Sequence, residues 1–287
     1  MAGNIQKLCV VGLGLIGGSV AKASRAFDQA KEIRGVDEDL TALNEAKQSL
    51  DGVTTELARG VADADLVVVA VPVMSIGNVV ETMVPYLKAG AIVSDVGSVK
   101  GPVVKEAERA LPSLNPFVGA HPIAGTERSG FSASLPDLFL GRLCVITPTA
   151  KTDRKALERV SRFWQGLGAR VTCMDTESHD RAFAALSHLP HLAAFGLLNT
   201  VRELASLDEE LLQYAGGGFK DFTRIGLSDP VMWRDICIMN HKFVLEMVER
   251  FQLALTRLKS AIEKGDGAEL EMELRQGKAL ATKVPRN

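Results

Sequence analysis

The stretch Lys7-Leu8-Cys9-Val10-Val11-Gly12-Leu13-Gly14-Leu15-Ile16-Gly17 decides the fold of this chain. An apolar run of strand length is followed by glycines in the spacing G-x-G-x-x-G, and helix-forming sequence continues from there to Phe27. Gly12 permits a tight turn, Gly14 lets the backbone approach a pyrophosphate, and Gly17 lets the helix pack closely on the strand. The helix presents its free N–H groups to an anion. The stretch therefore predicts a βαβ unit that binds a dinucleotide.

An acidic residue stands where such a unit contacts the ribose. Asp37 ends the next expected strand, about 20 residues after Gly17. Its carboxylate would accept hydrogen bonds from the ribose 2′-OH and repel a 2′-phosphate, and no arginine follows to bind a phosphate, so NAD is expected rather than NADP. A plain βα corner would also explain the glycines, but it would not require the acidic residue. The other residues expected at the cofactor are Leu15, Ile16, Val71 and Pro72.

The first half of the chain alternates short β-branched runs with amphipathic helical stretches, which is typical of a parallel sheet with helices on both faces. Leu66–Val71 is apolar throughout, as expected of a central strand buried on both faces. The other expected strands are Lys7–Val11, Glu32–Val36, Ala91–Asp95, Pro116–Ala120, Leu143–Thr147 and Arg170–Met174. The expected helices are Ile16–Phe27, Asp39–Leu50, Ser75–Met83, Val99–Ala110 and Asp153–Gly168. This pattern predicts an α/β domain of the Rossmann type, a doubly wound sheet, over residues 1–174.

The remainder of the chain has a helical pattern. The stretches Ala182–Leu207, Pro230–Lys264 and Gly267–Thr282 follow the helical period and contain almost no β-branched clusters. If Pro230–Lys264 were one helix it would be roughly 50 Å long, which is unusual in a compact monomeric lobe. Residues 175–287 are therefore expected to form an all-helical substrate and dimerisation domain, and the expected assembly is a homodimer.

Composition narrows the class of protein and the partners. Hydrophobic residues make up 46% and charged residues 24% of the 287 residues, and the formal net charge is −2. These values suit a globular protein and do not suggest a nucleic-acid or membrane partner, and no apolar run reaches the ~20 residues of a membrane span. The four cysteines are Cys9, Cys144, Cys173 and Cys237, and their scattered spacing predicts neither a disulfide nor a zinc site. A reducing cytoplasm is the expected location.

Two polar residues follow expected strands where ligands bind in a doubly wound sheet, beyond the carboxyl ends. Ser98 follows Ala91–Asp95, and His121 follows Pro116–Ala120, where Pro122 favours an extended conformation. The two side chains are expected to face the nicotinamide side of the cleft, close enough to form a hydrogen bond. A neutral histidine beside a hydroxyl-bearing substrate is suited to be the general base of an alcohol oxidation. Position alone also allows a core histidine and, for Ser98, a helix N-cap.

Four longer motifs accompany the glycine-rich stretch. They are His121-Pro122-Ile123-Ala124-Gly125-Thr126-Glu127-Arg128-Ser129-Gly130, Ser187-His188-Leu189-Pro190-His191, Gly216-Gly217-Gly218-Phe219-Lys220-Asp221-Phe222-Thr223-Arg224-Ile225, and the run from Ser228-Asp229-Pro230 to Met232-Trp233-Arg234-Asp235. Together they resemble the signature of the prephenate and arogenate dehydrogenases. With the nucleotide motif, the resemblance covers about residues 7–240.

The resemblance implies an NAD-dependent oxidative decarboxylation on the route to tyrosine. Hydride would leave the ring carbon that bears the 4-hydroxyl, His121 would take the hydroxyl proton, and the ring carboxylate would depart as CO2 while the ring becomes aromatic. Ser98 would hold the hydroxyl and orient His121, and Arg224 would bind a substrate carboxylate with its planar fork. Prephenate, arogenate or both could be the substrate. Two expected donors to a keto group, His191 and Lys220, favour prephenate.

Other substrate contacts are implied by the same resemblance. His188 and His191 would line the cleft near the pyruvyl side chain, and Pro190 between them is expected to kink the helix. A core pair or half of a metal site would also fit, but no third ligand follows at helical spacing, so no metal is expected. Lys220, one turn before Arg224, would meet the second carboxylate, either in its own subunit or in the partner subunit, unless it is a surface lysine. Thr126 and Glu127 are expected to gate or line the pocket, and Trp233, unless it is a core residue, to support it by packing near Arg224.

Two rival interpretations stay open. A β-hydroxyacid-type dehydrogenase would have the same two-domain plan but would use a catalytic lysine in its helical domain, and a non-catalytic NAD-binding protein would need no base at all. The presence of Ser98, His121 and Arg224 favours the first assignment. Neither a fused chorismate mutase nor a separate regulatory domain is expected beside these motifs. Any inhibition by tyrosine is therefore expected at the active site, in competition with the substrate.

Overall fold

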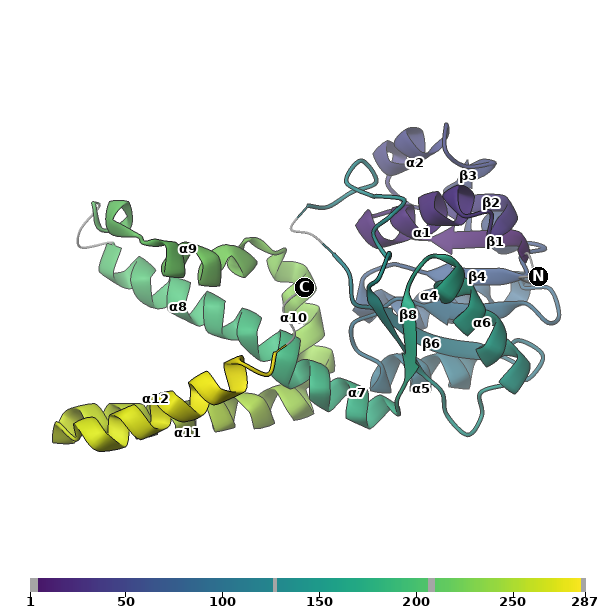
Figure 1. Ribbon diagram of the computed structural model, residues 1–287. Helices are drawn as coiled ribbons and strands as arrows, with labels where there is room; N and C mark the ends of the chain where they lie inside the picture. Colours follow the sequence, from purple (N-terminus) through teal and green to yellow (C-terminus); the bar gives the residue numbers. More distant parts are fainter. Residues whose placement is uncertain (1–4, 126–127, 206–209, 285–287) are drawn as a thin grey trace. The chain divides into compact units, whose positions relative to one another are not determined.

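The structure, a computed structural model, describes residues 5–125, 128–205 and 210–284 (Figure 1). The chain forms two compact units, Met1–Asn240 and His241–Asn287, and each is described by itself. Thr126 and Glu127 lie outside the described residues.

The first unit is built on an eight-stranded sheet with the order β3-β2-β1-β4-β5-β6-β7-β8. The strands are β1 (Ile5–Val11), β2 (Ala30–Val36), β3 (Gly52–Thr54), β4 (Leu66–Val69), β5 (Ile92–Asp95), β6 (Phe117–Pro122), β7 (Leu143–Thr147) and β8 (Arg170–Cys173). The strand order reverses between β1 and β4, so the chain passes to opposite sides of β1 there. In sheets of this kind ligands bind at that reversal, beyond the carboxyl ends of the strands.

The direction of the last two strands differs from the sequence prediction. The first six strands are parallel, but β7 pairs antiparallel with β6, and β8 is parallel to β7. The reason lies in the connection, because a parallel return needs a crossover, usually a helix. In residues 123–125 and 128–142 the connection contains turns and no helix. The pairing His121 with Val145 also places His121 inside β6, not after it.

Helices cover both faces of the sheet (Figure 1). Successive strand residues point to opposite faces: Val10 packs in the core with α1 (Leu15–Ala26), α2 (Leu40–Ala46) and α6 (Arg154–Gly166). Val11 packs on the other face, which is covered by α3 (Leu57–Val61), α4 (Ile76–Met83) and α5 (Gly101–Ala110). Two short 3-10 helices, Val73–Ser75 and Val84–Tyr86, flank α4. This doubly wound arrangement confirms the predicted fold class.

Helices follow β8 within the same unit. They are α7 (Thr176–Phe183), a π-helical segment (Ala184–His188), α8 (Leu189–Ala205), a 3-10 helix (Leu211–Tyr214), α9 (Gly217–Thr223), a second 3-10 helix (Arg224–Leu227) and α10 (Pro230–Met239). The π-helical segment ends two residues before Pro190, so the helix is irregular where the sequence predicts a kink. Trp233 and Ile236 anchor α10 in the core that also contains Val73.

The second unit consists of α11 (His241–Lys264) and α12 (Gly267–Ala281). The two helices are joined by ion pairs between Arg257 and Glu273 at 3.3 Å and between Lys264 and Glu269 at 3.6 Å. The long stretch predicted over Pro230–Lys264 is therefore not one helix, because α10 ends at Met239 and α11 begins after Asn240. Among the described residues, no helix is long and apolar enough to span a bilayer.

Candidate active site

The turn between β1 and α1 has the backbone geometry of a phosphate site. Gly12 has a φ of +92°, and a Cβ there would lie 2.6 Å from the Ala70 carbonyl oxygen. A Cβ on Gly17 would lie 1.8 Å from the carbonyl oxygen of Gly12. Gly14 is the N-cap of α1 and offers no side chain to its free N–H groups, and the place of its missing Cβ is open. The start of α1 is therefore suited to an anion, as the motif predicts.

Asp37 lies directly after β2, beside this turn. Its Oδ2 accepts a hydrogen bond of 2.6 Å from the Leu13 N–H, and its Oδ1 accepts one of 2.9 Å from the Asp39 N–H. The half-buried carboxylate is thus held next to the glycine-rich turn, where a ribose would lie. The other residues predicted at the cofactor surround the same turn: Leu15 and Ile16 in the first turn of α1, and Val71 and Pro72 after β4.

A chain of three side chains is built around His121. The Nδ1 of His121 lies 2.9 Å from the Nε2 of His179, and the Nδ1 of His179 lies 2.8 Å from the Oδ1 of Asp180. Because a carboxylate can only accept, the His179 Nδ1–H donates to Asp180 and the His179 Nε2 must accept. The His121 Nδ1–H then donates to His179, so the lone pair of His121 is on Nε2. This is the proton arrangement that a general base requires.

Burial keeps both rings neutral near pH 7. His121 is 9% exposed and His179 is 0% exposed. Burial holds the pKa of His121 well below its usual value of 6.5, and the charges of His179, Lys100 and His188 act in the same direction. Burial also lowers the pKa of His179, although its hydrogen bond to Asp180 opposes this. The ring of Phe183 covers both histidines, at 4.7 Å and 4.5 Å between ring centroids.

Ser98 lies after β5, on the loop that leads to α5, and is half-buried. The predicted hydrogen bond between Ser98 and His121 does not form in the described part of the chain, where the Nδ1 of His121 bonds to His179. Ser98 is also not a helix cap, because the N-cap of α5 is Lys100.

A buried ion pair joins the two strand ends that carry Ser98 and His121. Lys100 and Asp95 are both fully buried and in direct contact. The Lys100 Nζ also donates to the Ala120 carbonyl at 2.8 Å, and the Asp95 Oδ1 accepts from the Ala120 N–H at 3.2 Å. Removal of either charge would leave the other buried and uncompensated, at a cost of about 3–5 kcal/mol. The pair therefore fixes the position of His121 relative to the β5–α5 loop.

His188 and His191 have different surroundings. His188 is 1% exposed, and its Nδ1 accepts from the Nδ2 of Asn240 at 3.2 Å, while its Nε2 has no partner among the described residues. The half-buried His191 stacks on Trp233, with ring centroids 3.6 Å apart, and its Nδ1–H donates to the Ser187 carbonyl at 2.9 Å. Burial lowers the pKa of His191, so the ring is neutral near pH 7 and its Nε2 carries the lone pair. The donor to a keto group predicted at His191 would therefore need a second proton on this ring, and it stays a prediction.

Lys220 and Arg224 lie on the exposed segment formed by α9 and the 3-10 helix after it. This segment packs against α8, the helix that carries His191. The structure thus brings together the four histidines 121, 179, 188 and 191, and it places the two cations on a neighbouring surface of the helical part.

His179, Asp180 and Asn240 belong to the site but were not predicted from the sequence. The chain has only five histidines, and four of them meet in this cluster. Ser178-His179-Asp180 was the available signal, because adjacent histidine and aspartate residues are buried here in a helix of mostly polar residues.

Groups of histidine, cysteine or acidic residues suited to a metal ion do not occur among the described residues.

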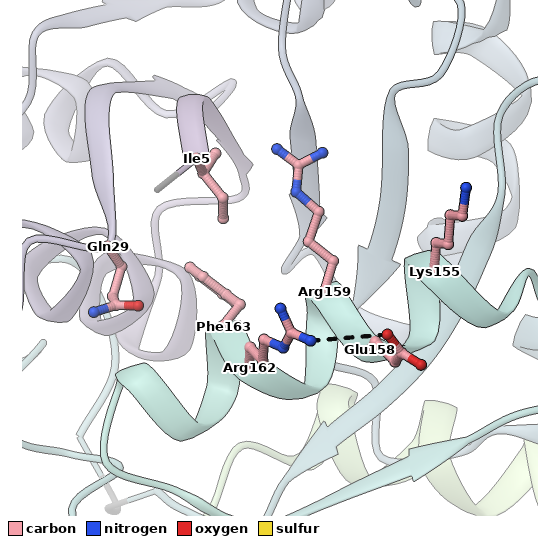
Figure 2. Close-up of a pocket in the computed structure, with 7 residues that line it drawn as sticks. All are labelled: Ile5, Gln29, Lys155, Glu158, Arg159, Arg162 and Phe163. Atoms are coloured by element: carbon pink, nitrogen blue, oxygen red, sulfur yellow. Dashed lines mark ion pairs between the residues drawn. The ribbon is translucent and has the colours of Figure 1, made fainter. Parts of the chain in front are cut away.

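A cavity of about 240 Å³ lies at the other end of the sheet. Figure 2 shows its lining, with Ile5 at the start of β1, Gln29 before β2, and Lys155, Arg159 and Arg162 along α6. Glu158 lies 3.8 Å from Arg162. The cavity is at the amino ends of the parallel strands, whereas the cofactor turn and His121 are at the carboxyl ends. It is therefore not the active site.

The titration of His188 predicts a loss of stability in acid. Burial lowers its pKa from 6.5 to about 4, so between these pH values the unfolded chain binds more protons than the folded one. The free energy of unfolding should therefore fall as the pH drops from 6.5 to 4, by about 3 kcal/mol for this residue. Urea unfolding at pH 7 and pH 4 of wild type and His188→Asn measures it, since the variant should lose less stability on acidification. Equal losses in both proteins would contradict the assignment.

The fold and this site define a Rossmann-type dinucleotide-binding protein with a histidine-centred cleft. The model of the prephenate dehydrogenase nucleotide-binding domain matches residues 20–173, and that of the prephenate dehydrogenase dimerization domain matches residues 175–276. The chain belongs to the prephenate dehydrogenase family. These matches confirm the resemblance seen in the motifs and the prediction of a nucleotide-binding domain.

Individual relatives agree with this assignment. The chain is 35% identical to the cyclohexadienyl dehydrogenase of Zymomonas mobilis, over 91% of this chain and 90% of that protein. It is 34% identical to the prephenate dehydrogenase of Bacillus subtilis, over 92% of this chain and 72% of that protein. A crystal structure of the prephenate dehydrogenase from A. aeolicus, in complex with hydroxyphenyl propionate and NAD+, superimposes with a TM-score of 0.93 at 37% identity. That match covers 99% of this chain and 100% of the other.

Proposed function

We propose that this protein catalyses the NAD-dependent oxidative decarboxylation of prephenate to 4-hydroxyphenylpyruvate, and that arogenate is an alternative substrate. The observation that carries the proposal is the chain Asp180–His179–His121, which leaves the His121 Nε2 as an acceptor at the carboxyl end of β6. The matching family models and the relatives named for this reaction support it.

The residues around the β1–α1 turn fit NAD. Gly12, Gly14 and Gly17 give a pyrophosphate access to the N–H groups of α1, with Leu15 and Ile16 in the same turn. Asp37 offers its carboxylate to the ribose and repels a 2′-phosphate, and Val71 and Pro72 flank the turn. When bound, NAD+ supplies the hydride acceptor of the reaction.

His121 handles the proton of the reaction. Its Nε2 takes the proton of the 4-hydroxyl as the ring carbon loses hydride, and it returns that proton to the oxygen when the loss of CO2 makes the ring aromatic. Ser98, on the loop after β5, holds the hydroxyl. His121 therefore acts first as a base and then as an acid, so the proton of the 4-hydroxyl need not be exchanged with solvent.

The substrate side chain is bound by the helical part. Arg224 binds one carboxylate in a forked geometry, and Lys220 meets the second. Trp233 supports the ring of His191, which faces the side-chain keto or amino group together with His188. Thr126 and Glu127 gate or line the pocket in this proposal. Since a neutral His191 accepts at Nε2, it suits the N–H of arogenate, whereas Lys220 suits the keto group of prephenate.

The test is NADH formation at 340 nm with purified protein, for prephenate and arogenate, each with NAD+ and with NADP+. Rapid reduction of NAD+ with prephenate is the expected result. Turnover of arogenate alone would keep the family assignment and change the substrate. Failure of both acids would overturn the proposed activity.

We propose a homodimer, with a dinucleotide-binding domain over residues 1–174 and a substrate and dimerisation domain over residues 175–287. The match of residues 175–276 to a dimerization domain supports this, as do exposed apolar side chains such as Leu212, Tyr214 and Leu227. A monomer mass by light scattering at micromolar concentration would contradict it.

Two further proposals concern inhibition and location. Tyrosine, which resembles the product, would compete with the substrate, so it should raise KM and leave kcat unchanged. An effect on kcat alone would argue against this site of inhibition.

The enzyme would work in the cytoplasm, since all four cysteines are free thiols, and recovery outside that compartment on fractionation would refute this.

A further inference from the structure

Asp180 is the point where four hydrogen bonds from three elements meet. Its Oδ1 accepts from the Lys100 N–H at 2.7 Å, and its Oδ2 accepts from the Gly101 N–H at 2.8 Å. The same Oδ1 lies 2.8 Å from the His179 Nδ1, and the backbone carbonyl of Asp180 accepts from the Asn240 side chain at 2.8 Å. Asp180 is 3% exposed, so these hydrogen bonds are shielded from solvent water.

The carboxylate replaces a missing helix cap. The N-cap of α5 is Lys100, whose side chain does not cap the helix and instead bonds to Asp95. Asp180 satisfies the first N–H groups of this ten-residue helix from a position 80 residues further along the chain. The positive end of the helix dipole favours an anion at this place. A Cβ on Gly101 would lie 2.9 Å from the Asp180 Oδ2, so a residue without a side chain suits this close approach.

This anchoring fixes the direction of the whole chain of hydrogen bonds. The α5 N–H groups make Asp180 an acceptor, Asp180 makes the His179 Nδ1 a donor, and the remaining nitrogen of His179 must then accept from His121. The reverse direction would place two donors or two acceptors against each other in a buried position, where each unsatisfied group is destabilising.

We propose that Asp180 is a positioning residue, which holds His121 in the tautomer with a free Nε2 by acting through His179. The proposal rests on the proposed function in one respect, because it takes His121 as the base. His179 and Asp180 do not touch the reacting atoms in this account.

The same three hydrogen-bonded side chains also compensate the positive charge that forms on His121 in the reaction. When the His121 Nε2 takes a proton, a second positive charge appears close to the buried ammonium of Lys100. The carboxylates that face this region are Asp95, which is paired with Lys100, and Asp180, which contacts His179. The ion pair of Asp95 leaves Asp180 as the anion that compensates the His121–His179 pair. His188 is the other titratable group acting on His121 through its charge.

The variant Asp180→Asn tests the proposal. When the NH2 group stands at the Oδ1 position, the amide oxygen still accepts from the Gly101 N–H, whereas the Lys100 N–H loses its acceptor. The NH2 group then faces His179 and demands an acceptor there. That reverses both tautomers and puts the proton on the His121 Nε2. We expect kcat with prephenate to fall by up to about a thousandfold, which is the loss expected when the base itself is removed, and Kd for NAD+ to stay within about twofold. Asp175→Asn is the matched control, because the Asp175 side chain caps α7 but contacts neither histidine, and the variant should keep its activity.

Nitrogen NMR of the histidine rings reads the tautomer without any turnover. Wild type should show His121 with its proton on Nδ1, and Asp180→Asn should show it on Nε2. A wild-type spectrum with the proton on Nε2, or full activity of Asp180→Asn, would overturn the proposal. The wild-type spectrum decides even if the variant does not fold. An inactive wild type with the expected spectrum would refute the proposed reaction but not the role of Asp180.

Discussion

Replacing His121 by asparagine should lower kcat with prephenate by about a thousandfold and leave Kd for NAD+ unchanged. The loss is the contribution of a well-placed general base. The asparagine side chain reaches the position of the His121 Nδ1 and can donate to the His179 Nε2, so the buried chain of hydrogen bonds keeps its partner. It has no atom at the position of Nε2. Initial rates at saturating prephenate and NAD+ measure the effect.

The measurement of Kd for NAD+ is the control for His121→Asn. The cofactor residues belong to the β1–α1 turn and to the ends of β2 and β4, and none of them contacts His121 through a hydrogen bond in the described chain. A β-hydroxyacid-type enzyme, with lysine as its catalytic group, would keep most of its kcat. Retained turnover in His121→Asn would therefore reject the histidine mechanism and support that rival.

The second large effect is expected at Asp37, in the choice between NAD+ and NADP+. In Asp37→Asn the amide oxygen can still accept from the Leu13 N–H, so the turn should keep its shape, and the exposed Asp39 N–H, which loses its acceptor, can bond to water. The charge that binds the ribose and repels a 2′-phosphate is lost. A hydrogen bond to a charged group contributes about 1.5–3 kcal/mol, so kcat/KM for NAD+ should fall by roughly 10- to 100-fold while that for NADP+ rises.

Glu38→Gln is the matched control for Asp37→Asn. Glu38 is the exposed neighbour, with the same charge, and Leu13 bonds to Asp37 instead. The preference for NAD+ should change by no more than about twofold in this variant, because the charge of the exposed Glu38 is largely screened by water and salt. Equal loss of preference in both variants would show that the general negative charge of the region selects the cofactor. An unchanged preference for NAD+ in both variants would show that Asp37 does not select the cofactor.

The nucleotide half of the site could be predicted because its geometry is local. Gly12, Gly17 and Asp37 act through backbone sterics and one strand end, and all three are where the motif places them. The general position of His121 could also be predicted, because strand ends collect in one place in a parallel sheet. The strand β3 escaped prediction because it has three residues at the edge of the sheet.

Tertiary contacts determine the features that the sequence does not reveal. The break after α10 has no proline or glycine to mark it; it falls at Asn240, whose side chain bonds to the Asp180 carbonyl and to His188. The partner of His121 is His179, 58 residues away, and not Ser98 as the order of strand ends suggested. The direction of β7 depends on the path of the connection from β6. No local propensity encodes such long-range pairings.

The proposed reaction is an oxidation coupled to loss of CO2, in which His121 is the base. The most direct test measures NADH at 340 nm and CO2 released from prephenate in the same reaction, for wild type and for His121→Asn. The account predicts one CO2 for each NADH with wild type, and that His121→Asn slows both together. NADH without CO2, CO2 without NADH, or a variant as fast as wild type would contradict it.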